Sequence, residues 1–576
     1  MLTDTLKKLA TFAWFLPGFL LWAAFPPMGE GADCLFALAP LLWLARRERP
    51  GLVAKRWFLN GLFFWVATLA WMPAIVKNGG PWPLVVLGWF ALAAYCAGYF
   101  ALFGWLAARY WRWARGVHAA APADGGLLLR LLGVLVVEPV LWCGLELVRS
   151  RFLGGFAWNQ LGVVPANFGF GAPAALGGVY LLSAVVLLVN GTVAGIAERM
   201  WKPAQSGFAG LKKLGTLETV AAFALIWALY SLAPTPELPN SHPPAPPTPQ
   251  TSKLPTPQTS KLPNAQTFFK VSLVQRNFPC VFKAQEDDPY AVYSNLLQNV
   301  ALLKPDLVVL SESALCEFGP VDQQGALRFA AFVRAQTGAA LLAGGTRFAE
   351  GNTYNSAALY ESRLAGERQE TGDGNIQTPK HPNIQTYDKV HLVPFGEFIP
   401  GDKWFPALQR LAPVGSCTPG EPRLLNLTLE SGAVIPLGVA ICFEDTDAAL
   451  VRTFAKMGAK ALVFVTNDSW FSQSDEPLAH AWQATARAVE TGLPVVRVGN
   501  SGVTGTITPR GRAAWLLGPE GRPLVDRPGT MLDRIPVAGG LSPTPYVRLG
   551  DAPLAVAFGL LVVGLAGAAL WGRRRI

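Results

Sequence analysis

The sequence has few charged residues for its length. Asp, Glu, Lys and Arg make up 15% of the 576 residues, and 51% are hydrophobic, whereas soluble domains carry roughly 25% charged residues. This scarcity excludes a wholly water-soluble protein, and we expect lipid to solvate much of the chain. The length predicts more than one domain.

Cysteine and histidine are also scarce. The seven cysteines include no C-x-x-C pair, and none of the five histidines has a second histidine at helical ligand spacing. These absences argue against a structural zinc site, and we expect neither a metal nor an organic cofactor. Cys34, Cys96 and Cys143 lie in apolar segments, where cysteine behaves as a small hydrophobic residue.

Apolar stretches predict a multi-pass membrane protein. The last of them would be about 28 Å long as a helix, which is enough to cross the core of a bilayer. The eight stretches cover 9–25, 34–45, 57–76, 83–108, 131–148, 172–197, 217–233 and 553–571. We therefore predict a bundle of seven helices over 1–233 and a C-terminal transmembrane helix at 553–571.

The net charge of +10 does not indicate a nucleic-acid partner, because no basic and aromatic stripe or known reader motif occurs. Lys and Arg instead cluster beside the apolar stretches, and eight helices place five clusters on one side, as the positive-inside rule expects. The clusters are Lys7 and Lys8; Arg46, Arg47, Arg49, Lys55 and Arg56; Arg109, Arg112 and Arg115; Arg199, Lys202, Lys212 and Lys213; and Arg573, Arg574 and Arg575. We expect both termini in the cytoplasm, with the large segment before the last helix on the periplasmic face of a bacterial inner membrane.

A Pro-rich stretch at 234–266 follows the seventh apolar stretch. Such a composition cannot pack a core and predicts an extended tether. The stretch contains an eight-residue repeat, PQTSKLPT at 249–256 and PQTSKLPN at 257–264, and NIQT occurs twice at 375–378 and 383–386. Two units are too few for a solenoid, so we interpret both repeats as surface insertions.

Between 267 and 545, short apolar runs alternate with helical stretches. The runs typical of buried strands are 269–275, 307–312, 339–345, 356–360, 434–442, 461–467 and 494–500, and the helical candidates are 289–304, 323–337, 446–458 and 477–492. The alternation predicts an α/β domain whose strands are covered on both faces. Ligands of such domains bind at the carboxyl ends of strands, where Glu312 and Cys442 lie.

Cys442 is a candidate nucleophile, although a lone cysteine at the end of an apolar strand is more often a buried packing residue. A thiol reacts as a thiolate, and a nearby cation and carboxylate base would activate it. Lys389 lies in YDKVHLVPFGEFIP, where a cation, a histidine and a carboxylate are crowded together. The alternative interpretation is that Lys389 is an exposed lysine and His391 a packing histidine.

Three motifs resemble the Glu–Lys–Cys triad of the nitrilase (carbon–nitrogen hydrolase) superfamily: LSES around Glu312, YDKVHLVPFGEFIP around Lys389 and ICFED around Cys442. With its apolar stretches on both sides, the chain resembles the apolipoprotein N-acyltransferase family, the membrane-embedded branch of that superfamily. The similarity extends to GGFAWNQLG (154–162), NTYNSAAL (352–359), NDSWF (467–471) and GNSGVTGTITPRG (499–511). It implies an α-helical membrane bundle joined to an αββα sandwich of the nitrilase type.

The resemblance also implies a ping-pong acyl transfer. Cys442 would attack an ester of a phospholipid, phosphatidylethanolamine by expectation, and hold the acyl chain as a thioester. Glu312 would act as general base, and Lys389 would stabilise the oxyanion. The acceptor would be the free α-amine of the diacylglyceryl-modified N-terminal cysteine of an apolipoprotein. We expect the enzyme to be a monomer in the lipid bilayer.

Further residues are implied to support the triad or to line the substrate site. The supporting residues are Glu397, Phe443 and Glu444, and the lining residues are Tyr354, Asn355, Trp470 and Phe471. Glu397 and Glu444 would fix Lys389 or its loop through charge-assisted hydrogen bonds. Phe443 stands where relatives often have tyrosine, so a role that needs a hydroxyl is not carried over to it. Ala284 stands where relatives often have the tryptophan of a mobile arm, so that gating role is not carried over either. Core packing is an equal alternative for Trp470 and Phe471.

Two other functions share part of this pattern. A membrane-anchored amidase or nitrilase would share the triad, but one or two helices would suffice to anchor it. A transporter or receptor with an inactive outer domain would have no need of the complete triad. The reaction products distinguish these functions from the transferase, because only the transferase passes an acyl group from Cys442 to an amine.

Overall fold

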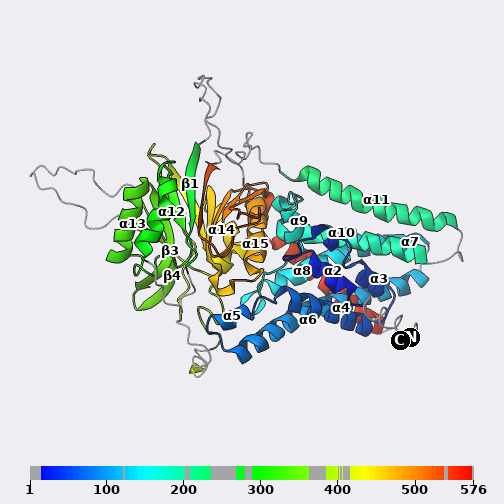
Figure 1. Cartoon of the computed structure of the whole chain (residues 1–576). Coiled ribbons are helices and arrows are strands. Elements are labelled where there is room, and N and C mark those ends of the chain that lie inside the picture. Colours follow the sequence, from blue (N-terminus) through cyan, green and yellow to red (C-terminus); the bar gives the residue numbers. More distant parts are fainter. Residues whose placement is uncertain are drawn as a thin grey trace, which may run out of the picture.

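The computed structural model of the chain consists of a helical bundle and an α/β domain (Figure 1). It describes residues 14–120, 123–201, 208–234, 267–278, 288–361, 384–399, 401, 405–406, 416–537 and 543–573. The start of the first apolar stretch, the linker from 235 to 266, Ala284 and the first NIQT repeat therefore lie outside the described residues. The linker and the domain boundaries drawn from the sequence stay predictions.

The bundle combines the N-terminal helices with the C-terminal one. In chain order its elements are α2 (Leu16–Ala23), η1 (Gly31–Leu35), α3 (Ala39–Ala45), α4 (Pro50–Thr68), α5 (Ala74–Lys77), α6 (Trp82–Ala120), α7 (Ala123–Leu132), η2 (Gly133–Val137), α8 (Glu138–Arg149), η3 (Phe152–Gly154), α9 (Val163–Asn167), α10 (Ala174–Trp201), α11 (Phe208–Leu232), α16 (Pro545–Leu549) and α17 (Ala552–Arg573). Large aromatic side chains fill its centre, where the Trp57 ring lies 4.7 Å from Phe103 and 6.0 Å from Trp142.

Three helices of the described chain are long and apolar enough to cross a membrane: Trp82–Val117, Gly126–Arg149 and Ala174–Glu198. Shorter apolar helices cover Gly31–Ala45, Leu217–Leu232 and Ala552–Ala568. The prediction of apolar membrane helices in the N-terminal region is confirmed in this coarser form. The count of eight spans stays a prediction.

One member of the basic clusters is buried inside the bundle. Arg46 is 3% exposed, and its Nη2 donates to Glu138 Oε2 at 3.0 Å and to the Gly191 carbonyl at 2.9 Å. Trp111 Nε1 donates to the other Glu138 oxygen at 2.8 Å. A buried charge is tolerated only when it is paired and hydrogen-bonded, so Arg46 joins three helical segments here.

The α/β domain contains two six-stranded sheets. The first has the order β12-β1-β2-β3-β4-β5 and the second the order β11-β10-β9-β8-β7-β6. The strands are β1 (Thr267–Gln275), β2 (Leu307–Leu310), β3 (Ala340–Ala349), β4 (Asn352–Tyr360), β5 (Ile384–Asp388), β6 (Leu424–Thr428), β7 (Val434–Ile441), β8 (Ala461–Asn467), β9 (Val495–Asn500), β10 (Gly505–Ile507), β11 (Ala513–Trp515) and β12 (Gly529–Val537). Within each sheet three central strands are parallel, β1 to β3 and β7 to β9.

Helices cover the outer face of each sheet and complete the predicted αββα sandwich (Figure 1). Helices α12 (Pro289–Ala301) and α13 (Gln324–Thr337) pack on the first sheet, and α14 (Ala448–Lys456) and α15 (Glu476–Thr491) on the second. The α15 residues Ala479, Ala486 and Val489 also belong to the bundle core. Helix α15 is therefore shared between the sandwich and the bundle.

A break in α10 strengthens this contact. Gly177 and Gly178 leave helical geometry, and Gly178 has a φ of 70°, a conformation that glycine adopts without strain. A Cβ at Gly178 would lie 2.6 Å from the Tyr546 ring. The Val179 N–H, released from the helical pattern, donates to Glu490 Oε1 of α15 at 2.7 Å.

Candidate active site

The predicted triad lies where strands of the two sheets end. Cys442 follows β7, Lys389 follows β5, and Glu312 lies two residues beyond β2. The Lys389 Nζ atom is 3.8 Å from Glu312 Oε1, and the charges of both side chains act on the Cys442 thiol. The structure therefore brings together three residues that are distant in the sequence.

Glu312 is held by two hydrogen bonds. Asn355 Nδ2 donates to Oε1 at 2.7 Å, and the Asn467 backbone N–H donates to Oε2 at 2.8 Å. Burial raises the pKa of Glu312, and the Lys389 charge opposes that increase. A fixed carboxylate with a raised pKa suits a group that must take up and return a proton.

Lys389 is fully buried and paired. Its Nζ donates to Glu397 Oε1 at 2.9 Å, and the Val393 N–H donates to Glu397 Oε2 at 2.7 Å. Burial lowers the pKa of Lys389, but Glu397 and Glu312 outweigh it and hold the pKa above its usual range. The ammonium therefore persists in an enclosed site, as a stabiliser of negative charge requires.

Glu444 joins the Cys442 segment to the lysine loop. Its carboxylate accepts the backbone N–H groups of Ile441 at 2.8 Å, Val390 at 2.6 Å and His391 at 3.0 Å. The Tyr387 hydroxyl donates to it at 2.9 Å. Although burial raises the pKa of Glu444 to about 7, these donors fix its orientation. Glu444 thus fixes the loop of Lys389 through hydrogen bonds, and its charge also helps to raise the pKa of Lys389.

Cys442 begins η5 (Cys442–Thr446) with a φ of 55°. A left-handed backbone is strained for a residue other than glycine, and surrounding contacts must maintain it. Burial and the Glu312 carboxylate raise the pKa of the thiol well above its usual value, while Lys389 lowers it. The thiol is therefore protonated at rest and needs a base at the moment of attack.

A second, more exposed contact joins the same two loops. The His391 Nδ1 forms an ion pair with Asp447, and this histidine is about half exposed. The hydrogen bond to Asp447 raises the pKa of His391. Burial acts to raise the pKa of Asp447, but the hydrogen bond and the charge of His391 outweigh it and hold this pKa below its usual value.

These pKa directions predict how the contact depends on pH. A raised histidine pKa adds stability that is complete below the unfolded value near 6.5 and is lost as pH rises through the folded value. We expect His391→Gln to lower the melting temperature at pH 6 by a degree or two, because an exposed pair contributes less than about 1 kcal/mol. Melting curves in detergent from pH 5 to 9 would contradict this expectation if the loss were the same at every pH.

Aromatic residues join the nucleophile segment to the bundle. The Phe443 ring is stacked on Phe156 at 6.3 Å and on Trp158 at 6.4 Å, with interplanar angles of 15° and 12°. Phe471, in η6 (Asp468–Phe471), meets Trp71 edge-on at 4.8 Å. The side of the site that faces the bundle is consequently apolar.

The remaining predicted lining residues have different surroundings. Asn355 donates to Glu312 and, at 2.6 Å, to Glu397 Oε1. Tyr354 is the next residue along β4 and therefore points to the opposite face of the strand, where the Arg347 guanidinium lies 4.6 Å from its ring centroid. The Trp470 carbonyl accepts from Asn78 Nδ2 of the bundle at 2.7 Å. The lining roles of Tyr354, Trp470 and Phe471 stay predictions.

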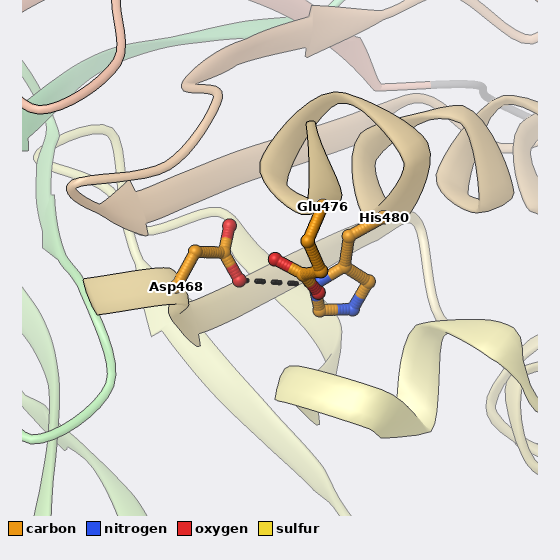
Figure 2. Close-up of side chains that lie close together, drawn as sticks. All are labelled: Asp468, Glu476 and His480. Carbon is orange, nitrogen blue, oxygen red and sulfur yellow. Dashed lines mark hydrogen bonds and ion pairs between the residues drawn. The ribbon is translucent and has the colours of Figure 1, made fainter. Parts of the chain in front are cut away.

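Sequence reasoning missed a group of buried charged residues behind Cys442. Among the described residues, Asp468, Glu476 and His480 form the group close enough to hold a metal ion, with ligand atoms within 4.8 Å of one another (Figure 2). The i, i+4 spacing of Glu476 and His480 is the signal that the sequence offers, and it differs from the pair of histidines that is typical of a zinc site. The Arg497 guanidinium, 3.4 Å from Asp468, already supplies a cation.

Comparison with known proteins agrees with this architecture. Residues 270–531 match the carbon–nitrogen hydrolase family model, and residues 17–192 match that of the apolipoprotein N-acyltransferase N-terminal domain. Proteins named apolipoprotein N-acyltransferase from Geobacter metallireducens and Methylococcus capsulatus are each 28% identical to this chain. The alignments cover 86% of this chain and 84% of the first relative, and 97% of this chain and 95% of the second.

Among solved structures, an amidase from Nesterenkonia sp. AN1 is 18% identical and aligns with 51% of this chain and 98% of its own, with a TM-score of 0.34. The matched family model and the strand-end Glu–Lys–Cys cluster make the α/β domain a member of the carbon–nitrogen hydrolase class. The N-terminal match and the full-length relatives narrow the assignment. The chain belongs to the apolipoprotein N-acyltransferase family, a membrane-embedded branch of that class.

Proposed function

We propose that this enzyme transfers an acyl chain from a phospholipid, through a Cys442 thioester, to the α-amine of the diacylglyceryl-modified N-terminal cysteine of apolipoproteins. The observation that carries this proposal is the stacking of Phe443 on Phe156 and Trp158. It joins the segment of the nucleophile directly to the membrane bundle. A lipid ester entering from the bundle would meet an apolar wall beside the thiol, which a hydrolase of small soluble amides does not require.

The first half-reaction loads the enzyme. Glu312 takes the thiol proton as the sulfur of Cys442 attacks the ester carbonyl of the phospholipid. The Lys389 ammonium stabilises the resulting oxyanion. The intermediate collapses as the C–O bond breaks, and the proton on Glu312 passes to the departing alkoxide, which leaves as a lysophospholipid. Cys442 then carries the acyl chain as a thioester.

The second half-reaction transfers the chain. The neutral α-amine of the acceptor attacks the thioester carbonyl, and Glu312 removes the proton of the developing ammonium. Lys389 again stabilises the oxyanion. The C–S bond breaks, and Glu312 returns the proton to the Cys442 sulfur, so that the products are an amide and the free thiol. Only side chains of this chain and the two substrates take part.

Asn355 gives the base its rigidity in this mechanism. It donates to both Glu312 and Glu397, while Lys389 lies between the same carboxylates at 3.8 and 2.9 Å. Glu397 and Glu444 support the triad, Glu397 through the ammonium and Glu444 through the lysine loop. We propose Trp470 and Phe471 as the apolar entrance for the acyl chain.

The test is the intact mass of the purified enzyme after incubation with phosphatidylethanolamine, the donor we propose. We expect a hydroxylamine-sensitive acyl adduct on the wild type and none on Cys442→Ala. Cys442→Ser serves as a matched control, because an oxygen ester at this position would resist hydroxylamine at neutral pH. An enzyme that stays unmodified while it releases free fatty acid would instead favour the membrane-anchored hydrolase.

We further propose eight membrane spans in the bacterial inner membrane, with the α/β domain in the periplasm and both termini in the cytoplasm. The five basic clusters support this orientation. Green fluorescent protein fused after Ile576 is expected to fluoresce, whereas alkaline phosphatase fused at the same place is expected to be inactive. The opposite pair of results would contradict the orientation. We also propose that the enzyme is a monomer, which light scattering in detergent would test.

A further inference from the structure

Five buried ionisable side chains lie directly behind the nucleophile, and the proposed mechanism uses none of them. They are Asp445, Asp468, Glu476, His480 and Arg497, each at most 2% exposed. They come from η5, η6, α15 and β9. Burying this many charges is costly unless each is paired, so their arrangement needs an explanation.

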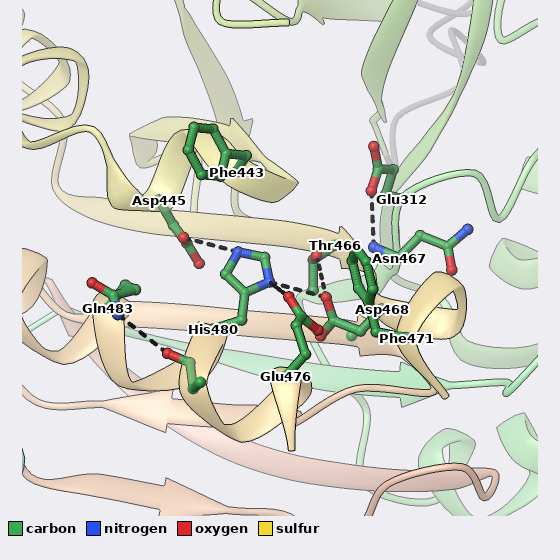
Figure 3. A network of polar contacts seen from close by, with 12 residues as sticks. Glu312, Phe443, Asp445, Thr466, Asn467, Asp468, Phe471, Glu476, His480 and Gln483 are labelled. Atoms are coloured by element: carbon green, nitrogen blue, oxygen red, sulfur yellow. Dashed lines mark hydrogen bonds and ion pairs between the residues drawn. The ribbon is translucent and has the colours of Figure 1, made fainter. Parts of the chain in front are cut away.

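Two cations connect two carboxylates in a closed ring. The His480 Nε2 lies 3.1 Å from Asp445 Oδ1, and its Nδ1 lies 3.0 Å from Asp468 Oδ1 (Figure 3). Arg497 forms an ion pair with the same Asp445 through Nη1 and lies 3.4 Å from Asp468 Oδ2 through Nη2. Because a carboxylate oxygen lies 3.0 or 3.1 Å from each ring nitrogen of His480, the imidazolium, which carries a proton on both nitrogens, is the form that fits.

Each carboxylate belongs to a segment that carries part of the active site. Asp445 lies three residues after Cys442 in η5. Asp468 follows Asn467, whose N–H holds Glu312. Strands β7 and β8 are parallel neighbours, so the ring fixes the loop of the nucleophile against the loop that holds the base. The strained backbone of Cys442 is the kind of conformation that such fixation maintains.

The ring also contacts the bundle. The His480 ring lies 5.5 Å from the Trp158 ring, and Trp158 is stacked on Phe443. Thr466 donates to Asp468 Oδ1 at 2.9 Å from the end of β8. His480 therefore touches both active-site segments and the apolar wall of the site.

The charges balance without a metal ion. Burial lowers the pKa of His480, but Asp445 and Asp468 together raise it to about 10. Burial and the neighbouring Asp468 raise the pKa of Glu476 well above its usual range, which makes it a neutral acid. The carboxylates of Asp445 and Asp468 then face the cations of His480 and Arg497. A divalent ion bound among Asp468, Glu476 and His480 would require Glu476 to lose its proton and His480 to lose one of its two ring protons.

We propose that His480 is a positioning residue, which as an imidazolium bridges Asp445 and Asp468 and holds the Cys442 loop and the Glu312 anchor in their reactive arrangement. This inference rests on the proposed function for the identity of the nucleophile and the base. The charged and titratable groups around His480 are Asp445 in η5, Asp468 in η6, Glu476 in its own helix and Arg497 in β9.

The experiment follows Cys442 itself. The full-length enzyme in detergent is alkylated with iodoacetamide for a fixed time from pH 5 to 10, and the Cys442 peptide is quantified by mass spectrometry. The midpoint pH is the pH at which half of this peptide is alkylated in that time. We expect His480→Gln to raise the midpoint pH of alkylation by about one unit, because it leaves Asp468, whose charge raises the pKa of the Cys442 thiol, without the imidazolium. The rate of acylation by phosphatidylethanolamine is expected to fall about 10- to 100-fold at pH 7, with the KM for lipid changed less than about twofold.

Two further variants separate charge from structure. The double variant Asp468→Asn/His480→Gln restores charge balance, and its midpoint pH is expected to return toward that of the wild type. Glu476→Gln removes an acid that is already neutral, so we expect it to leave the midpoint unchanged and to serve as the matched control. Unaltered midpoints in both His480 variants, with lower melting temperatures alone, would overturn the proposal.

Metal analysis provides the other decisive outcome. One divalent ion per purified chain, lost from His480→Gln, would overturn the proposal in favour of a metal site. Alkylation needs no lipid, so a wild type that forms no acyl adduct would defeat the proposed function while the midpoint comparison still tests His480. The two failures are therefore distinguishable.

Discussion

Glu312→Gln is expected to slow the formation of acyl-Cys442 about 1,000-fold, within the range that general-base catalysis contributes. The glutamine keeps the size of the side chain and accepts a hydrogen bond through only one atom. It therefore either leaves the Asn467 N–H without its acceptor or leaves Asn355 with Glu397 as its remaining acceptor. More importantly, it cannot take the proton of a thiol whose pKa is raised by burial. Single-turnover acylation, followed by intact mass, measures the effect.

The pH profile distinguishes a base from a packing residue. Burial raises the pKa of Glu312, and the base acts only as a carboxylate, so wild-type acylation must fall as pH drops through this raised pKa. Glu312→Gln is expected to lose this acid limb. The matched control, Glu312→Asp, keeps the charge and shortens the reach, so the acid limb should persist at a lower rate. An acid limb retained in Glu312→Gln would contradict the assignment.

Lys389→Met is expected to lower the rate of acylation about 100- to 1,000-fold, the usual effect of removing an oxyanion stabiliser. The substitution preserves the length of the side chain and removes the positive charge. It also leaves Glu312 and Glu397 facing each other without the cation that lies 3.8 and 2.9 Å from them. Breaking such a buried pair costs about 3–5 kcal/mol of stability, so the melting temperature has to be measured beside the rate.

A double variant separates these two effects. Lys389→Met/Glu397→Gln removes the unpaired charge and should recover much of the melting temperature. The acylation rate should stay low, because the oxyanion still lacks its ammonium. Recovery of both quantities together would mean that Lys389 serves only to stabilise the fold.

The main elements of the α/β domain could be predicted because their sequence patterns are local. All seven apolar runs became strands, from β1 at Thr267–Gln275 to β9 at Val495–Asn500, and all four helical stretches became helices. Strands β5, β6, β10, β11 and β12 were not predicted. The interpretation of the second NIQT copy as a surface insertion was wrong, because its last three residues begin β5 and pair with β4. Strands β10 and β11 have three residues each, and β12 contains charged residues that interrupt alternation.

In the candidate site, the sequence predicts the residues that lie in recognisable motifs and not the contacts that depend on the fold. Glu312, Lys389 and Cys442 were located through three motifs, and the geometry brings them together. The hydrogen bond from the Asn467 backbone to Glu312 involves no side-chain identity, so no pattern of residue types reveals it. The ring around His480 joins residues 445, 468, 480 and 497, and such pairing depends on the strand order of the second sheet. Trp158 reaches Phe443 from the bundle, a contact between segments almost 300 positions apart.

The fate of a preformed acyl-enzyme tests the central claim most directly. Enzyme loaded with a labelled acyl chain and freed of phospholipid is mixed with a diacylglyceryl-modified peptide that has a free N-terminal cysteine amine. We predict that the mass of the enzyme falls by one acyl group as the peptide gains the same group on its amine, in an amide that resists hydroxylamine. Loss of the acyl group to water as free fatty acid, with the peptide unchanged, would contradict the account and assign the enzyme to the hydrolases.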